Sequence, residues 1–246
     1  MTGPSPEALA AVLVAHGDRG GASPNSALEA QAVAVRALTG LGMVTTGVLK
    51  GDRTIEHALA DAAASGASRI AVYPLFMADG YFVQKVRDRI LAVGLTPEPA
   101  LLTPLGLDPG LPDILVQEAI ATAEAHGIDP AKARLLVVGH GSKLGPASAT
   151  ATRKAAARAA LARRFATVTT AFLEEEPFID DVLRTTAATP TVIAGFFFGD
   201  GMHAGEDVPE AIAETGANAV YTGAIGNSPA VAPLIAATLL AIQDPK

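Results

Sequence analysis

The feature that most constrains this chain is an internal repeat whose first part recurs at a spacing of 124 positions; further on, Gly80 matches Gly201 at 121. An apolar run ending in His-Gly occupies residues 12–17 and again residues 136–141. The matches continue downstream in the same register, as Leu49 with Leu173, Ile55 with Ile179 and Leu59 with Leu183. A pattern stated twice at a fixed spacing predicts two copies of one folding unit.

Within each copy, short apolar runs alternate with longer amphipathic segments. The short runs, bounded by Gly, Pro or charge, predict buried strands at residues 11–15, 44–49, 69–76, 100–103, 134–138, 167–172, 191–198 and 219–222. The longer periodic segments predict helices at residues 26–38, 54–65, 83–92, 112–126, 147–163, 179–187, 208–215 and 229–242. Regular alternation of strands and helices indicates parallel strands with helices on both faces of a sheet.

We therefore predict an α/β chain of two tandem, doubly wound parallel-sheet domains that arose by internal duplication. The boundary falls at residues 127–130, which gives domains of residues 1–127 and 128–246. Open α/β sheets bind ligands outside the carboxyl ends of their strands. We expect a cleft between the two domains at those ends.

Composition excludes several classes of protein. The 246 residues contain no cysteine, so disulfides, thiolate metal sites and thiol nucleophiles are excluded. The apolar runs are shorter than the roughly 20 residues that span a bilayer, and the first residues have no signal-peptide pattern. The net charge is −7, without a basic stripe. We expect a cytoplasmic chain with neither a membrane nor a nucleic acid as partner.

Three potential ligands follow strands of the second copy. His140 ends the first strand, Glu174 ends the second, and His203 follows a glycine turn after the third. Two imidazoles and one carboxylate suit a divalent transition metal such as Co²⁺ or Fe²⁺ with open coordination positions. Because Glu174 begins a run of three glutamates, Glu176 is the alternative ligand. The residues alone do not distinguish Co²⁺, Fe²⁺ and Ni²⁺.

The second ring nitrogen of a metal-binding histidine needs a hydrogen-bond partner, and Glu206 or Asp207 could supply it. Asp207 could instead cap the helix that begins at Val208-Pro209.

Two other functions can be argued from short motifs. Gly199, Gly201 and Ala204 imitate a dinucleotide fingerprint, but no acidic residue follows at the required distance of about 20 positions. Ser142 lies near His140, as in a hydrolase, but the Gly-x-Ser-x-Gly motif is missing. Both interpretations are weaker than a metal site.

The motifs of the second copy resemble the ordered motifs of class II tetrapyrrole chelatases, above all the sirohydrochlorin cobaltochelatases and ferrochelatases of the CbiX/SirB type. They are His-Gly-Ser-Lys at residues 140–143, Phe-Leu-Glu at 172–174 with Pro177 close behind, and Gly-Met-His-Ala-Gly-Glu-Asp-Val-Pro at 201–209. The resemblance spans both copies. It implies a bilobal α/β fold and ATP-independent insertion of Co²⁺ or Fe²⁺ into sirohydrochlorin, in cobalamin or siroheme biosynthesis.

The first copy keeps His16 but has Lys50 where the second has Glu174, and Phe82 where the second has His203. It cannot offer the same three ligands, so we expect the active site in the second copy, as in chelatases of the CbiK type. His140, His203 and Glu174 are the predicted catalytic and metal-binding residues.

His16, Ser142 and Phe82 are the residues we expect at the tetrapyrrole. The metal is a substrate, and we expect no organic cofactor. Since two lobes could replace the dimer of shorter relatives, we expect a monomer. The alternative function is a tetrapyrrole or metal carrier without turnover.

Overall fold

A computed structural model of the chain describes residues 8–17, 25–143, 145–199, 201 and 203–243. These residues form two compact units. Unit 1 comprises residues up to Leu105 together with those from Pro229 onward, and unit 2 comprises Gly106–Ser228. Each unit is described by itself.

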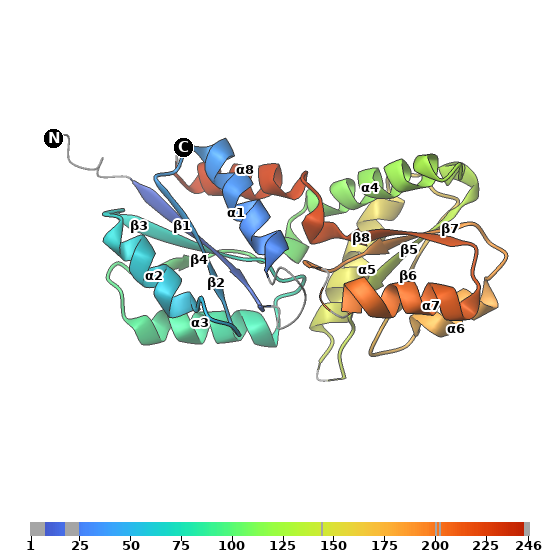
Figure 1. Cartoon of the computed structure of the whole chain (residues 1–246), viewed down its shortest axis with the longest axis horizontal. Helices are drawn as coiled ribbons and strands as arrows, with labels where there is room; N and C mark the ends of the chain where they lie inside the picture. Colours follow the sequence, from blue (N-terminus) through green and yellow to red (C-terminus); the bar gives the residue numbers. More distant parts are fainter. Residues whose placement is uncertain (1–7, 18–24, 144, 200, 202, 244–246) are drawn as a thin grey trace. The chain divides into compact units, whose positions relative to one another are not determined.

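Unit 1 is a four-stranded parallel sheet in the order β2-β1-β3-β4. Its elements are β1 (Leu9–Ala15), α1 (Ser26–Thr39), β2 (Met43–Val48), α2 (Ile55–Ala64), β3 (Arg69–Pro74), α3 (Tyr81–Val93), β4 (Ala100–Leu101) and α8 (Val231–Gln243). The helices α2 and α3 pack on one face of this sheet, and α1 with α8 beside it covers the other (Figure 1).

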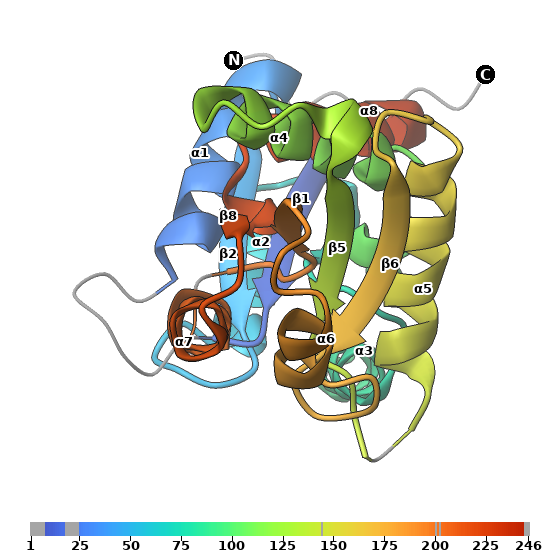
Figure 2. The same cartoon turned by 90° about the vertical axis from the view of Figure 1, so that its right-hand side faces the viewer.

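Unit 2 repeats this topology in the order β6-β5-β7-β8. Its elements are α4 (Leu111–Ala125), β5 (Arg134–Gly139), α5 (Ala147–Ala160), β6 (Thr167–Phe172), α6 (Ile179–Thr185), β7 (Thr191–Gly195), α7 (Val208–Thr215) and β8 (Ala219–Ala224). Figure 2 shows α6 and α7 on one side of this sheet. The prediction of two parallel, helix-covered sheets is confirmed.

The two sequence copies exchange their last helices, so that each helix packs in the unit built mainly from the other copy. Although α4 belongs to the first sequence copy, it packs against α5, β7 and β8 of unit 2, and α8 of the second copy packs against α1 of unit 1. Side-chain hydrogen bonds also tie each exchanged helix to its unit. Arg69 Nη2 donates to the Gln243 carbonyl at 3.1 Å, and the Ser228 hydroxyl donates to Glu118 Oε1 at 2.6 Å. The predicted domains 1–127 and 128–246 therefore do not delimit the packing units, because sequence repetition does not reveal where a helix packs.

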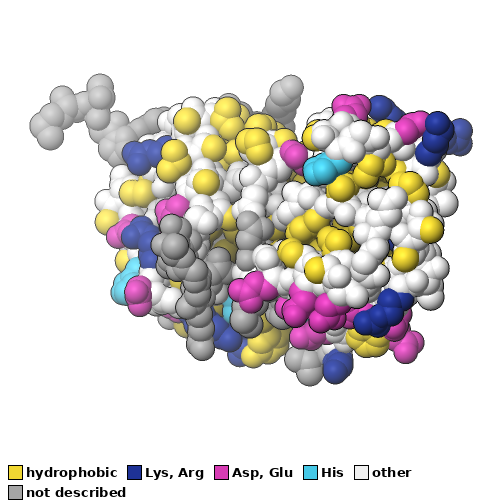
Figure 3. Space-filling model, turned by 45° about the vertical axis from the view of Figure 1, so that its right-hand side comes forward, with side chains coloured by type: hydrophobic (Ala, Val, Ile, Leu, Met, Phe, Trp, Pro, Cys, Tyr) yellow, Lys and Arg dark blue, Asp and Glu magenta, His cyan; other side chains and the backbone are white. Residues whose placement is uncertain are grey.

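Most charged side chains lie at the surface, whereas Arg134 is buried. In Figure 3, acidic side chains gather along the lower part of the visible face, while Lys and Arg side chains occur in smaller, separate groups. No helix among the described residues is both long and apolar enough to cross a membrane.

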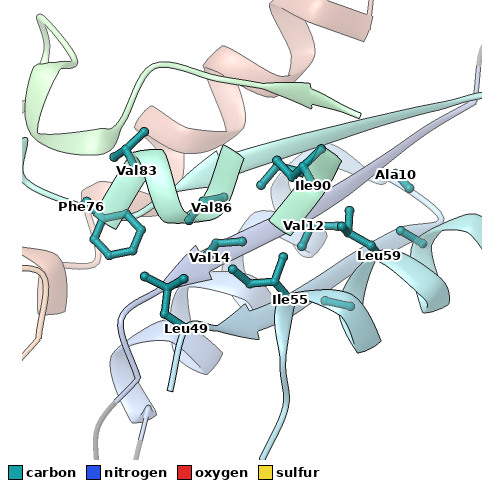
Figure 4. Packing of buried hydrophobic residues seen from close by; sticks show 13 residues of the cluster. Ala10, Val12, Val14, Leu49, Ile55, Leu59, Phe76, Val83, Val86 and Ile90 are labelled. Carbon is teal, nitrogen blue, oxygen red and sulfur yellow. The ribbon is translucent and has the colours of Figure 1, made fainter. Parts of the chain in front are cut away.

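The core of unit 1 follows from the alternation of side chains along β1. Val12 and Val14 point to one face, where Ile55 of α2 and Val86 of α3 meet them (Figure 4). All four side chains are fully buried. In unit 2, Leu136 and Val138 of β5 occupy the same places beneath α6 and α7. Each sheet thus holds the carboxyl ends of its strands rigidly, which is where the candidate site lies.

We predict that truncating a buried side chain of α8 loosens the first copy's sheet. Ile235, fully buried, is the test position, and Leu240, 40% exposed on the same helix, is the matched control. Ile235→Ala should cost about 2–5 kcal/mol of unfolding free energy and accelerate amide hydrogen exchange in α1, β1 and β2. Faster exchange in β5–β8 instead would contradict the helix exchange.

Candidate active site

The site in unit 2 is created by backbone pairing that continues beyond the last residues of β5 and β6. The Glu174 N–H donates to the His140 carbonyl at 2.9 Å, and the Leu173 N–H lies 3.2 Å from the same oxygen. Because parallel strands end at one edge of their sheet, these bonds hold the residues after β5 and β6 side by side. His140 and Glu174, 34 positions apart in sequence, therefore become neighbours.

The side chains of His140 and Glu174, the first two predicted ligands, lie close together. Nδ1 of His140 lies 3.9 Å from Oε2 of Glu174, and the two side chains are 38% and 47% exposed. This separation exceeds hydrogen-bond length. It lies within ion-pair distance if the imidazole is protonated, and both side chains are partly exposed to solvent.

The tautomer of His140 is set by its own backbone. Nδ1 lies 2.9 Å from the Gly141 carbonyl oxygen, and a carbonyl can only accept a hydrogen bond. Nδ1 therefore carries the proton, and in the neutral ring Nε2 carries the lone pair. His16 has the same arrangement with the Gly17 carbonyl at 3.1 Å, so both copies retain this feature.

The backbone of His203 opens a π-helical turn, His203–Asp207, directly before α7. The amides of Ala204 and Gly205 both donate to the Gly201 carbonyl at 3.0 Å. The side chain of His203 lies outside the described part of the structure. Asp207 has helical backbone angles and no side-chain capping bond, so the helix-cap interpretation of Asp207 is wrong: the π-helical turn continues into α7.

Among the side chains that the structure describes, no three His, Asp or Glu residues form a group able to hold a metal ion. Of the three predicted ligands, His140 and Glu174 are brought together. The predicted third ligand, His203, is not among the side chains searched.

Sequence reasoning missed Glu175, the middle glutamate of the run. Its Oε2 accepts from the Ser142 N–H at 2.9 Å, and its Oε1 lies 3.3 Å from Nη2 of Arg153. Residues 173–177 form bends rather than a strand, so the period-two alternation of a strand could not distinguish Glu175 from its neighbours. Glu174 and Glu176 are both exposed. Ser142, a predicted tetrapyrrole contact, lies on the loop that Glu175 holds.

In the first copy, an aromatic cluster occupies the corresponding strand ends. The His16 and Phe82 rings meet edge to face with centroids 4.7 Å apart, and Phe82 stacks on Phe76 at 6.0 Å. Tyr81 contacts Phe82 at 5.5 Å, and Nζ of Lys85 lies 5.3 Å from the Tyr81 ring centroid. Phe76 is buried, whereas Phe82 and Tyr81 are 41% and 67% exposed. The cluster thus presents aromatic surface and a cation to solvent.

The described geometry defines a class: a duplicated α/β protein whose second copy places an imidazole and a carboxylate side by side at its strand ends. The solved CbiX, "the terminal Enzyme for Biosynthesis of Siroheme in Denitrifying Bacteria", is 32% identical, with a TM-score of 0.80 over 94% of this chain and 98% of that one. SirB from Bacillus subtilis, solved with Fe³⁺, shares the fold with a TM-score of 0.80 at 20% identity, over 95% of this chain and 94% of that one.

A curated relative, the probable sirohydrochlorin cobaltochelatase of Halobacterium salinarum, is 27% identical over 68% of this chain and 69% of its own length. The CbiX family model matches the chain twice, over residues 10–122 and 134–241. The chain belongs to the CbiX family, and the resemblance predicted from its motifs is confirmed.

We predict that Gly141→Ala destabilises unit 2. Gly141 has a φ of +74°, which L side chains rarely adopt, and an added Cβ would lie 2.8 Å from Cγ of Glu175 and 3.1 Å from Cβ of Phe172. The expected loss is about 1–3 kcal/mol of unfolding free energy, measured by urea denaturation. Gly145→Ala, where an added Cβ meets nothing within 4 Å, should stay within about 0.5 kcal/mol. Equal losses in both variants would contradict the prediction.

Proposed function

We propose that this protein inserts a divalent metal ion, Co²⁺ or Fe²⁺, into sirohydrochlorin without ATP, as a step of cobalamin or siroheme biosynthesis. Membership of the CbiX family and the names of the relatives support this reaction. The observation that carries it is the pairing of His140 with Glu174 at the strand ends of the copy whose sequence also holds His203.

The reaction makes three demands. A hydrated ion must lose water, the macrocycle must turn its nitrogen lone pairs toward the ion, and two pyrrole N–H protons must leave. An imidazole nitrogen and a carboxylate can hold the ion weakly or accept those protons. We assign Nε2 of His140 and the Glu174 carboxylate to these tasks, since the two groups share one solvent-facing space.

His203 is the proposed third participant. Its backbone belongs to the turn that leads into α7, after the third strand of the same sheet. Metal-binding histidines usually donate their other ring proton to an acceptor. We propose the carboxylate of Asp207 or Glu206, on the same turn, as that acceptor.

The first copy is proposed to bind the tetrapyrrole. Phe82 and Tyr81 offer exposed aromatic faces to a flat macrocycle, and His16 adjoins them. The ammonium group of Lys85, beside Tyr81, is proposed to form ion pairs with the carboxylates at the edge of sirohydrochlorin. Ser142 is proposed to contact the substrate from unit 2.

The proposed setting is the cytoplasm, without an organic cofactor and without nucleic acid or membrane partners. We propose a monomer, because each chain already contains two copies of the chelatase-like unit. The metal is a substrate, and the ligand set accepts either Co²⁺ or Fe²⁺.

We predict that the two copies respond differently when their histidines are removed. Anaerobic insertion of Co²⁺ or Fe²⁺ into sirohydrochlorin can be followed by absorbance. His140→Ala and His203→Ala should each lower kcat at least about hundredfold, the scale of lost acid–base catalysis. His16→Ala should mainly raise the KM for sirohydrochlorin. Equal loss of kcat in all three variants would contradict an active site confined to the second copy.

The same assay distinguishes an enzyme from a carrier. Wild-type protein that binds sirohydrochlorin but never exceeds the uncatalysed rate with either metal would be a carrier, and the proposed reaction would be withdrawn.

We predict that Phe82→Ala weakens tetrapyrrole binding and leaves chemistry intact. Loss of one aromatic contact, worth about 0.5–1.5 kcal/mol, should raise the KM for sirohydrochlorin about two- to thirteenfold with kcat nearly unchanged. The matched control is Leu91→Ala, which removes an exposed apolar side chain from the same helix, α3. An unchanged KM in Phe82→Ala would exclude Phe82 from the substrate site.

A further inference from the structure

One peptide group, Gly141–Ser142, links the carboxylate of Glu175 to the imidazole of His140. Its Oε2 accepts a hydrogen bond from the Ser142 N–H at 2.9 Å. The carbonyl of the same peptide group, Gly141 C=O, accepts from Nδ1 of His140 at 2.9 Å. A peptide group is planar and its C=O and N–H point in opposite directions. Carboxylate, peptide and imidazole therefore form a continuous hydrogen-bonded chain.

The carboxylate is itself held from a second element. Its other oxygen lies 3.3 Å from Nη2 of Arg153 on α5, and the guanidinium of Arg153 sits 4.8 Å from the centroid of the Phe172 ring. The Glu175 side chain is 23% exposed, half as much as Glu174 at 47%. A carboxylate fixed by a cation and a backbone amide keeps one orientation.

Close packing of the loop leaves the peptide group little freedom to turn. Gly141 lies against the stem of Glu175 and against Phe172, so closely that a Cβ there would have Cγ of Glu175 at 2.8 Å. Since rotation of the Gly141–Ser142 peptide would break both of its hydrogen bonds, the position of Glu175 determines where the Gly141 carbonyl points.

The first copy provides an internal comparison. Lys50 N–H donates to the His16 carbonyl at 2.9 Å, as Glu174 N–H does to His140, so the two backbones correspond. The residue that follows Lys50 is Gly51, so the first copy has no carboxylate at the position of Glu175. Nδ1 of His16 still lies near the following carbonyl oxygen, but at 3.1 Å, against 2.9 Å for His140 in the copy with the carboxylate.

We infer that Glu175 is a positioning residue that reinforces the Nδ1-protonated tautomer of the His140 imidazole through the Gly141–Ser142 peptide. In this tautomer Nε2 is the ring nitrogen that can coordinate a metal or accept a proton. Charge-assisted acceptance at Ser142 N–H polarises the peptide and makes the Gly141 carbonyl a better acceptor. The importance of this tautomer for turnover rests on the proposed chelatase function.

The test uses Glu175→Ala and Glu175→Gln, with Glu214→Gln, an exposed acid on α7, as control. Two-dimensional ¹H–¹⁵N spectra of the metal-free protein at about pH 8.5, where imidazoles are neutral, report the His140 tautomer. We expect the Nδ1–H form in wild type and in Glu214→Gln, and a shift toward Nε2–H in Glu175→Ala. Glu175→Gln keeps an acceptor oxygen for Ser142 N–H and should retain most of the Nδ1–H form.

Turnover gives the second readout. Loss of a residue that orients a metal ligand lowers activity about 10–100-fold, so kcat of Glu175→Ala should fall by that factor, while the KM for sirohydrochlorin stays within about twofold. Glu175→Gln should recover kcat to within about threefold of wild type and also serves if the alanine variant does not fold.

An unchanged His140 tautomer in folded Glu175→Ala would overturn the inference, whatever the activity. If Glu175→Ala shifts the tautomer but the wild type inserts no metal, the inference is supported and the proposed chelatase function is wrong. The two failures are therefore distinguishable.

Discussion

The hydrogen bond from the Glu174 amide to the His140 carbonyl, at 2.9 Å, is the interaction on which the candidate site depends. It extends the pairing of β5 and β6 beyond the strands, and it holds two exposed side chains within 3.9 Å of each other without any direct bond between them. The paired backbone thus brings together two side chains that are each more than one-third exposed.

Duplication preserved this backbone and let the side chains diverge. The equivalent bond in the first copy, from Lys50 to His16, has the same length. There, a cation replaces the carboxylate, and the Phe82 ring meets the histidine edge to face. One framework therefore carries an imidazole beside a carboxylate in unit 2 and an aromatic, cationic surface in unit 1.

The exchange of α4 and α8 makes the two copies dependent on each other for their cores. Leu111 and Leu115 of α4 are buried in unit 2, and Ile235 and Leu239 of α8 are buried in unit 1. Each copy, cut at the repeat boundary, would keep only one of the two helices that cover one face of its sheet: α1 without α8, or α5 without α4. Burial of these apolar side chains is a large part of what stabilises each unit.

The sequence by itself determined the strands and helices, the parallel sheets and the duplication, because hydrophobic periodicity and repeat spacing are local properties of the chain. It also placed His140 and Glu174 at the ends of neighbouring strands. It could not show that α4 and α8 pack with the opposite copy, since both helices are apolar enough to cover either sheet. It did not show that Asp207 leaves α7 uncapped, because a π-helical turn has no distinct periodicity. Only the tertiary structure separated Glu175 from Glu174, because three identical side chains in a row differ solely in the directions the folded backbone gives them.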